Sequence, residues 1–325
     1  MRIGIYGYGN LGRGVECALH SSKDAQLVGI FTRRAPSSIK TVFGTPVFSS
    51  EKVSDFKKKI DVMIICGGSA TDLPEMTPAL AMDFNVVDSF DNHADVMRHF
   101  AAVDKAASSG GKLALISSGW DPGLFSLARL YFSAFLPEGK TYTFWGKGVS
   151  QGHSDAVRNI EGVLDARQYT IPNDEAMADV LTGNFPTLRP TDMHRRECYV
   201  VAKPEANKEK MTRKIKNMPA YFRGYDTSVS FISTEELLEK HGKMSHGGRV
   251  IRSGKTGVDF SNLSALELNL KLDSNPEFTA GVLLASARAV YRMSSRGDVG
   301  AKTLFDVTPT DFSELAREEI IATLL

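Results

Sequence analysis

The stretch Ile3-Gly4-Ile5-Tyr6-Gly7-Tyr8-Gly9-Asn10-Leu11-Gly12 runs from a short apolar segment through a G-x-G-x-x-G pattern into a helical one. In that order the three glycines have separate uses. Gly7 allows a tight turn, Gly9 lets the backbone approach a pyrophosphate, and Gly12 permits a helix to pack closely on a strand. The N-terminus of the helix supplies aligned N–H donors. The stretch therefore predicts a dinucleotide site at the first turn of a parallel sheet.

The pattern continues to about residue 118, with short apolar runs alternating with helical stretches. The predicted strands are residues 3–6, 26–31, 62–66, 86–87 and 113–116, and the predicted helices are residues 11–20, 73–82 and 94–108. The run 62–66 is apolar at every position, which is typical of a central strand covered on both faces. We therefore expect an α/β fold with a Rossmann-type, doubly wound sheet.

Beyond residue 119 the order of strands and helices becomes less regular. Segments 141–145, 167–171, 197–202 and 265–272 are predicted strands, and 265–272 alternates in polarity, so one face of that sheet meets water or a partner. We interpret the chain as an NADP-binding domain over 1–120 and an α+β substrate-binding and dimerisation domain over 121–272. Segment 273–325 returns to pack on the first domain through a helix over 276–293.

Composition restricts the partners and the compartment. The 325 residues carry Lys+Arg 39 against Asp+Glu 38, so no overall field favours nucleic acid or an anionic membrane. Three scattered cysteines, Cys17, Cys66 and Cys198, fit reduced thiols in the cytoplasm. We expect no signal peptide, no membrane span and, without paired histidines, no metal site.

The end of the second predicted strand bears on the choice of cofactor. An NAD site usually has an acidic residue here, whereas this chain reads Phe31-Thr32-Arg33-Arg34. Guanidinium groups match the geometry of a 2′-phosphate, and a carboxylate would repel it. The turn therefore favours NADP, and an exposed charged turn is the alternative. The loop Cys66-Gly67-Gly68-Ser69-Ala70-Thr71 lies where open sheets bind ligands, although it also fits an ordinary turn.

Six further segments carry a resemblance to one family: Asp88-Ser89-Phe90-Asp91-Asn92-His93, Ser118-Gly119-Trp120-Asp121-Pro122-Gly123, Phe144-Trp145-Gly146, Ser150-Gln151-Gly152-His153-Ser154-Asp155, Met244-Ser245-His246-Gly247-Gly248 and Lys271-Leu272-Asp273-Ser274-Asn275-Pro276. With the glycine pattern they resemble the meso-diaminopimelate D-dehydrogenases from near residue 1 to beyond residue 290. The resemblance implies a homodimer that converts meso-2,6-diaminopimelate, NADP and water to L-2-amino-6-oxopimelate, ammonia and NADPH. The reaction is reversible, acts at the D centre and belongs to lysine and cell-wall precursor biosynthesis.

The resemblance also implies site residues. The substrate contacts would be Asp91, Asp121, Trp145, Gln151, Gly152, Thr170, Arg196, His246 and Asn275. The cofactor contacts would be Tyr8, Gly9, Asn10, Leu11, Thr32, Arg33, Arg34, Cys66, Gly67, Gly68, Ser69, Ala70, Thr71, Phe90, Asp91, Asn92, Ser118, Gly119, Trp120 and Asp121. The glycine pattern itself adds Gly7 and Gly12 to the cofactor set.

The chemistry of these residue types suits such a substrate. Arg196, Thr170 and His246 can bind the carboxylate of the non-reacting L end, and Asn275 can both donate to and accept from an amino acid head group. Two arginines, Arg195 and Arg196, are adjacent in this chain, and the resemblance implies that Arg196 is the one that contacts the substrate.

Asp91 and Asp121 are the candidate catalytic residues. The reacting ammonium must lose a proton before hydride leaves its carbon, and one of the two carboxylates would accept that proton and later activate water. A helix cap before Pro122 is the alternative for Asp121, and a polar turn is the alternative for Asp91. Trp145 fits a wall over the substrate as well as it fits a core position, and we expect His153 to be structural.

Two other functions remain open at this stage. A non-catalytic NADP-sensing regulatory protein would bind cofactor without turnover. A related two-domain oxidoreductase would act on a sugar or on aspartate semialdehyde, and the sugar enzymes would show a Lys-Pro pair near the cofactor. Here the Lys203-Pro204 pair follows a late strand.

Overall fold

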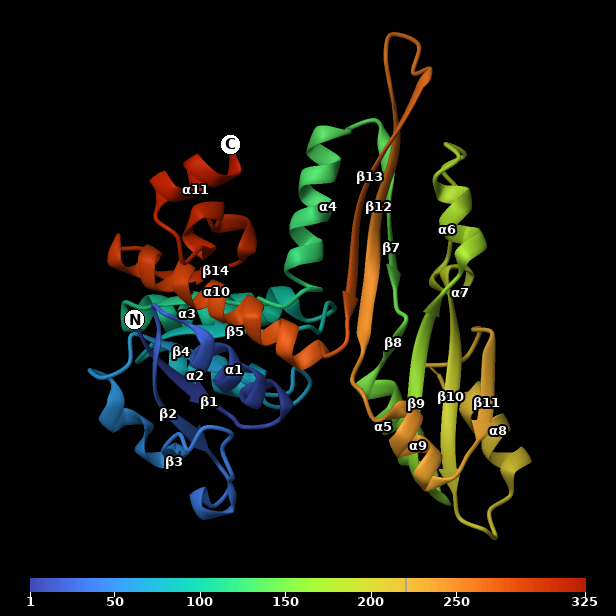
Figure 1. Ribbon diagram of the computed structural model, residues 1–325, viewed down its shortest axis with the longest axis horizontal. Helices are drawn as coiled ribbons and strands as arrows, with labels where there is room; N and C mark the ends of the chain where they lie inside the picture. Colours follow the sequence, from blue (N-terminus) through green and yellow to red (C-terminus); the bar gives the residue numbers. More distant parts are fainter. Residues whose placement is uncertain (220) are drawn as a thin grey trace. The chain divides into compact units, whose positions relative to one another are not determined.

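The fold was determined as a computed structural model that describes residues 1–219 and 221–325 (Figure 1). The chain forms two compact units: Met1–Leu127 with Pro276–Leu325, and Ala128–Asn275. We call them the nucleotide unit and the substrate unit. The divisions differ slightly from those predicted at residues 120 and 272. The first falls inside helix α4 (Leu124–Phe135), and the second falls at the start of helix α10 (Asn275–Ser295).

The nucleotide unit is built on a seven-stranded sheet of order β14-β6-β5-β4-β1-β2-β3, and every pair of neighbours is parallel. Its strands are β1 (Arg2–Tyr6), β2 (Gln26–Thr32), β3 (Val47–Ser49), β4 (Val62–Ile65), β5 (Asn85–Asp88), β6 (Leu113–Leu115) and β14 (Gly300–Lys302). The order reverses at β1, where open sheets of this kind bind ligands. This is the doubly wound sheet that the sequence predicts.

Helices connect the strands of this sheet. They are α1 (Asn10–Ser21), α2 (Leu73–Ala81), α3 (Val96–Gly110) and α10, with α11 (Arg317–Leu324) near the end of the chain. Short 3-10 turns lie at Pro36–Ser38, Ser50–Phe56, Leu304–Asp306 and Pro309–Phe312. The predicted helices over 11–20, 73–82, 94–108 and 276–293 correspond to α1, α2, α3 and α10.

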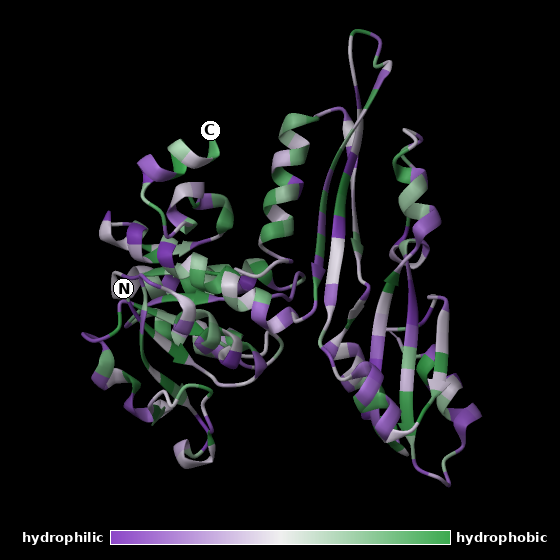
Figure 2. Ribbon diagram, in the orientation of Figure 1, coloured by the Kyte–Doolittle hydropathy of each residue, from purple (hydrophilic) through white to green (hydrophobic). Residues whose placement is uncertain are grey.

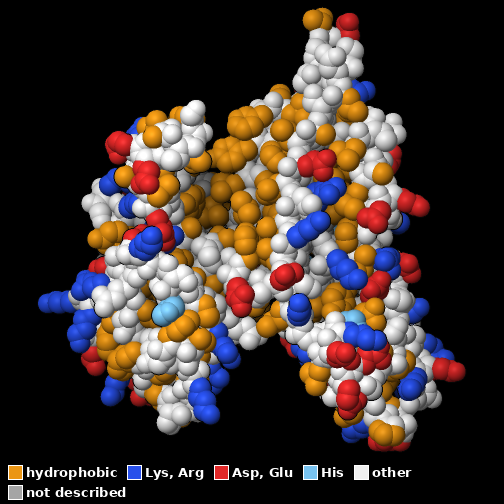
Figure 3. All heavy atoms as spheres, in the orientation of Figure 1, with side chains coloured by type: hydrophobic (Ala, Val, Ile, Leu, Met, Phe, Trp, Pro, Cys, Tyr) orange, Lys and Arg blue, Asp and Glu red, His pale blue; other side chains and the backbone are white. Residues whose placement is uncertain are grey.

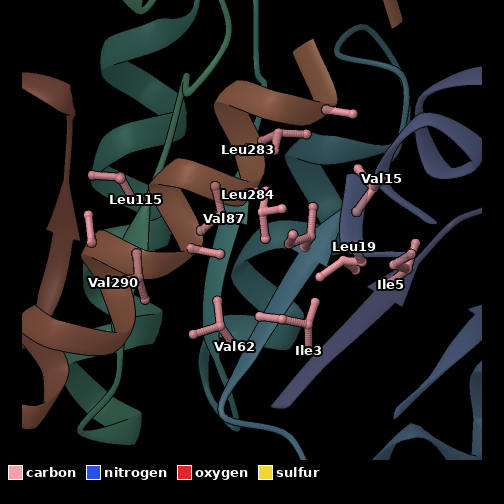
Figure 4. Close-up of a cluster of buried hydrophobic side chains, with 14 of the residues drawn as sticks. Ile3, Ile5, Val15, Leu19, Val62, Val87, Leu115, Leu283, Leu284 and Val290 are labelled. Carbon is pink, nitrogen blue, oxygen red and sulfur yellow. The ribbon is translucent and has the colours of Figure 1, made fainter. Parts of the chain in front are cut away.

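Apolar side chains cover both faces of the sheet. All four residues of β4 are buried, as its unbroken apolar run predicts. On one face α10 contributes Leu283, Leu284 and Val290, which lie against side chains from the sheet such as Val62 and Val87 (Figure 4). Figure 2 shows the same strands as mainly hydrophobic. The last 50 residues of the chain therefore complete the core that the first residues begin.

The substrate unit contains two sheets. One has the order β11-β10-β9-β8 and the other the order β13-β12-β7. The strands are β7 (Gly139–Trp145), β8 (Gly148–Val149), β9 (Val163–Pro172), β10 (His194–Ala202), β11 (Thr227–Phe231), β12 (His246–Thr256) and β13 (Asn262–Leu272). The helices are α5 (Gln151–Arg158), α6 (Asp174–Val180), α7 (Pro190–Met193), α8 (Lys208–Lys216) and α9 (Thr234–His241).

The second half of α4 covers one face of the three-stranded sheet. Arg252 on β12 is buried and donates hydrogen bonds to the carbonyls of Leu136 and Pro137, just beyond the helix. Val250 lies two residues before Arg252 on β12, so the two side chains are on the same face of the sheet. Leu268 on β13 is paired with Val250 and therefore shares that face. The alternating pattern predicted over 265–272 is thus a strand with one apolar face. Among the described residues no helix is long and apolar enough to cross a membrane.

Candidate cofactor and substrate sites

The glycine turn lies between β1 and α1 in the nucleotide unit. Gly7 has a φ of +97°, and a Cβ on it would lie 2.3 Å from the carbonyl oxygen of Cys66. A Cβ on Gly12 would lie 2.4 Å from the carbonyl oxygen of Gly7, whereas a Cβ on Gly9 would meet nothing within 4 Å. Two glycines thus permit the turn itself, and the third leaves the backbone open toward the N-terminus of α1. This arrangement fits a bound pyrophosphate.

The side chain of Tyr8 points away from that opening. Its hydroxyl donates to the carboxylate of Glu16 on α1, and burial is the main reason that the pKa of Tyr8 rises to about 12. Glu16 also accepts from the hydroxyl of Thr45 at 2.6 Å and from the backbone N–H of Val42 at 2.9 Å. Tyr8 can therefore offer a cofactor its backbone, while its ring anchors the turn to segment 42–45.

The two arginines after β2 have different surroundings. Arg34 donates a hydrogen bond to the carbonyl of Tyr8, which holds its guanidinium at the glycine turn. Arg33 is 62% exposed in its side chain and forms an ion pair with Asp72 at 2.6 Å. The pKa of Asp72 lies below its ordinary value because Gly68 N–H and Arg33 both stabilise its charge. Thr32 is buried and accepts from the N–H of Arg34 at 3.1 Å.

The loops after β4, β5 and β6 lie at the same edge of the sheet. The N–H of Asp91 donates to the hydroxyl of Ser69 at 3.0 Å, which joins the loop over 66–71 to the loop over 90–92. The N–H of Ser118 donates to the carbonyl of Asp88 at 2.8 Å. The structure thus brings together the predicted cofactor residues from three separate segments of the chain. Burial raises the pKa of the Cys66 thiol to about 12.

The two candidate catalytic residues in this unit differ in exposure. Asp91 is exposed on its loop, whereas Asp121 is half-buried in a tight turn over 118–123. Helix α4 begins at Leu124, so Gly123 occupies the position before it, and the helix-cap alternative for Asp121 is not supported. Trp120 and Phe90 are buried. Trp120 packs edge-on against Phe125 with ring centroids 5.1 Å apart.

In the substrate unit, Thr170 and Arg196 are paired residues of β9 and β10. Arg196 is buried, donates to the hydroxyl of Thr170, and stacks over the ring of Tyr225 at 4.2 Å. Burial lowers the pKa of Arg196 from its ordinary value. Arg195 instead is 50% exposed in its side chain and is paired with Glu197. The alternation of β10 therefore places Arg196 in the interior of the unit and Arg195 at its surface, and Arg196 as the substrate contact stays a prediction.

Trp145 ends β7 and is half-buried. Its backbone N–H donates to Nε2 of His194 at 2.8 Å, and the two rings stack with centroids 5.4 Å apart. The other ring nitrogen of His194 lies 3.1 Å from the carbonyl oxygen of Pro190, so it is the donor and the imidazole is neutral. Burial lowers the pKa of His194 to about 4. Sequence reasoning did not identify this histidine, although it directly precedes the Arg195-Arg196 pair.

His153 and Gln168 lie near Arg196. His153 shares a 2.5 Å hydrogen bond with the hydroxyl of Ser150, and burial together with the Arg196 charge lowers its pKa to about 4. Gln168 lies two residues before Thr170 on β9 and is completely buried.

Gln151, His246 and Asn275 converge around Met244. The amide of Gln151 donates to the sulfur of Met244 at 3.2 Å, and the N–H of Asn275 donates to the Met244 carbonyl at 2.9 Å. His246 begins β12, and burial lowers its pKa. It also lines a cavity of about 350 Å³ whose other lining residues include Gly146, Lys147, Arg249 and Lys271. A Cβ on Gly152 would meet nothing within 4 Å, so this helix end is open.

A parallel sheet with an open glycine turn and an arginine beside it, together with a second unit that buries an arginine, defines a two-domain, nucleotide-dependent dehydrogenase. No group of histidine, cysteine and acidic residues in the described chain could hold a metal. Comparison with known proteins gives the family: the chain belongs to the meso-diaminopimelate D-dehydrogenases.

Relatives of that name are similar over their full length. The protein from Acetivibrio thermocellus is 53% identical, with 100% of this chain and 98% of the relative covered. The protein from Corynebacterium glutamicum is 44% identical over 99% and 98%. The family profile described as the diaminopimelic acid dehydrogenase C-terminal domain matches residues 119–274.

Two solved structures extend this likeness. Diaminopimelate dehydrogenase of C. glutamicum in complex with diaminopimelate has a TM-score of 0.92 at 43% identity, covering 100% of this chain and 99% of that one. An engineered D-amino acid dehydrogenase bound to NADP+ has a TM-score of 0.87 at 41% identity, with the same coverage. The comparisons confirm the predicted family, the fold class, the amino-acid dehydrogenase class and NADP as the cofactor.

Proposed function

We propose that this chain catalyses the NADP-dependent oxidative deamination of meso-2,6-diaminopimelate at its D centre, giving L-2-amino-6-oxopimelate and ammonia. The reaction is reversible and supplies lysine and cell-wall precursors. The observation that carries this proposal is the 53% identity, over the whole chain, with a relative named for the reaction. The residues of both units supply the groups that such a reaction needs.

The substrate unit would hold the non-reacting L end. Arg196 offers a buried guanidinium beside the hydroxyl of Thr170, and a buried fork of donors matches a carboxylate. Asn275 and Gln151, both in contact with Met244, offer amide groups to the amino acid head group. Trp145, held by His194, forms an apolar wall, so this end is recognised by charge and by shape.

The nucleotide unit would hold NADP. Gly7 and Gly12 permit the turn, Gly9 leaves room for the pyrophosphate, and Arg34, held beside the glycine turn, would bind the 2′-phosphate of the cofactor. When bound, NADP accepts the hydride from the D carbon. Arg33 would first exchange its ion pair with Asp72 for the phosphate.

Asp91 and Asp121 would carry out the proton transfers of the reaction. One of them accepts a proton from the ammonium group at the D centre, and it then helps to activate the water that attacks the imine. Replacement of Asp121 by Asn tests its part. Activity within a few-fold of the wild type, with unchanged substrate affinity, would remove Asp121 from the mechanism.

The protein would act as a homodimer in the cytoplasm. Within the substrate unit α4 exposes Phe135 to 72%, Leu130 to 47% and Tyr131 to 42%, and Figure 3 shows hydrophobic side chains along this helix. A second copy covering this face would remove that apolar surface from water. Sedimentation of Phe135→Lys should show a shift to monomer. Phe305→Lys, at an exposed position of the nucleotide unit, is the control and should stay dimeric.

The activity is tested with stereoisomers. Purified protein is mixed with NADP and, separately, with the meso, LL and DD forms of diaminopimelate, while the absorbance of NADPH is followed. We expect a response to the meso form alone, because both ends of the substrate are held. Equal turnover of all three isomers would overturn this specificity. NADP binding without any turnover would instead favour the NADP-sensing function.

A further inference from the structure

A completely buried carboxylate lies at the end of β5, behind the loops that carry the candidate catalytic residues. Asp88 accepts from the N–H of Phe90 at 3.1 Å and from the N–H of Ser117 at 2.9 Å through one carboxylate oxygen. Its backbone carbonyl accepts from the N–H of Ser118 at 2.8 Å. A single residue therefore binds the backbone of two loops that are far apart in the sequence.

Those loops lead directly to the two aspartates. Phe90 precedes Asp91, and Ser117 and Ser118 begin the turn that contains Asp121. Ser117 has a φ of +55°, a left-handed conformation that non-glycine residues seldom adopt unless their surroundings enforce it. Its N–H is one of the groups that Asp88 holds. The conformation of the second loop thus depends on this carboxylate.

The other carboxylate oxygen is fixed from two helices. It accepts from the hydroxyl of Thr77 on α2 at 2.8 Å and from Nε2 of His99 on α3 at 2.7 Å. Both side chains are buried, and the His99 ring stacks on Phe90 with ring centroids 4.1 Å apart and ring planes 13° from parallel. Because both oxygens are engaged, the carboxylate cannot rotate about its bond without breaking several hydrogen bonds.

We propose that Asp88 is a positioning residue that sets the placement of Asp91 relative to Asp121, and that Thr77 and His99 hold its carboxylate in the required orientation. This inference rests on the proposed function, because it assumes that these two aspartates act on the substrate ammonium. All of the contacts lie within the nucleotide unit. Neither Thr77 nor His99 belongs to the cofactor or substrate set.

The test removes the supporting donors and leaves Asp88 in place, since loss of Asp88 itself would leave buried N–H groups without acceptors and risks the fold. Thr77→Val keeps the shape of the side chain and removes the hydroxyl. His99→Phe keeps an aromatic ring against Phe90 and removes the donor. We expect kcat to fall about 10-fold in each, because small misplacements of reacting groups are costly, while the Kd of NADP stays within about twofold. Thr77→Ser keeps the hydroxyl, so its kcat should stay close to that of the wild type.

Asp311→Asn is the matched control. Asp311 is also a buried carboxylate of the nucleotide unit, where it binds Arg296 at 2.7 Å. Its replacement should lower the melting temperature without lowering kcat. If Thr77→Val and His99→Phe lower kcat no more than Asp311→Asn does, Asp88 stabilises the fold but does not position the two aspartates.

Amide hydrogen exchange gives a readout that does not depend on turnover. The N–H groups of Phe90, Ser117 and Ser118 should exchange faster in Thr77→Val and His99→Phe than in Asp311→Asn. Unchanged exchange at these amides would overturn the positioning role even if the wild type proved inactive. Inactivity of the wild type would by itself contradict only the proposed function.

Discussion

The two units build their sites in different ways. In the nucleotide unit the candidate residues come in short runs directly after parallel strands, as in the glycine turn after β1 and the loop over 66–71 after β4. In the substrate unit they are single side chains, such as Thr170, Arg196 and His246, brought together by long antiparallel pairings. The comparison shows that a backbone-built site can be identified from a local motif, whereas a side-chain-built site depends on strand register.

The two sites also differ in the polar and charged groups that they contain. The glycine turn works through the absence of side chains, and its groups are neutral N–H donors. The substrate site instead contains the buried guanidinium of Arg196, the buried His194 and the half-buried His153, and the pKa of each histidine is lowered to about 4. Buried charge and neutral histidines make the substrate site more sensitive to substitution and to pH than the glycine turn is.

The largest effect should follow loss of Arg196. Arg196→Met should lower kcat/KM for meso-diaminopimelate by about 100-fold or more, because removing one partner of a buried, hydrogen-bonded charge pair costs about 2 to 5 kcal/mol. The Kd of NADP, measured by fluorescence titration, should not change. Arg195→Met is the control, since Arg195 is exposed and paired with Glu197. Equal losses in the two variants would contradict the assignment by strand alternation.

A smaller effect should separate the two cofactors. Arg34→Ala should raise the Kd of NADP about 10-fold, because a hydrogen bond to a charged group contributes roughly 1.5 to 3 kcal/mol, and should leave the Kd of NAD nearly unchanged. Calorimetric titration measures both. Lys105→Ala, an exposed position on α3, controls for the lost charge. A parallel rise for NAD and NADP would mean that Arg34 supports the glycine turn through Tyr8 and does not contact the 2′-phosphate.

The smallest effect concerns pH and the substrate unit. The pKa of His194 is about 4 in the folded protein, below its ordinary value of 6.5, so at intermediate pH the unfolded chain binds a proton that the folded chain does not. The stability from this group is complete above pH 6.5 and is lost as pH falls, by about 1 kcal/mol per pH unit.

Urea unfolding at pH 7, 6 and 5 measures this loss. His194→Gln keeps an acceptor for the N–H of Trp145 and does not titrate, so its stability should depend less on pH than that of the wild type. The same slope in both proteins would show that His194 is not the source of the dependence. It would also weaken the contrast in pH sensitivity between the substrate site and the glycine turn.

Much of the fold could be predicted from the sequence, because parallel strands and their helices leave strong periodic signals. The unbroken apolar run at β4 and the glycine turn are local features, and the structure has both. The residues that sequence reasoning missed, Asp88, His99 and His194, act through contacts between distant segments. An aspartate at the end of a strand can have many roles. The contacts that suggest a positioning role for Asp88 come from the packing of α2 and α3 around it.

The division of the chain has a consequence for its synthesis. The substrate unit is one continuous segment, Ala128–Asn275, whereas the nucleotide unit needs Leu283, Leu284 and Val290 of α10 to close its core. On the ribosome the middle of the protein can therefore finish folding before the beginning does. The first 127 residues must wait, with an incomplete core, until nearly the whole polypeptide has emerged.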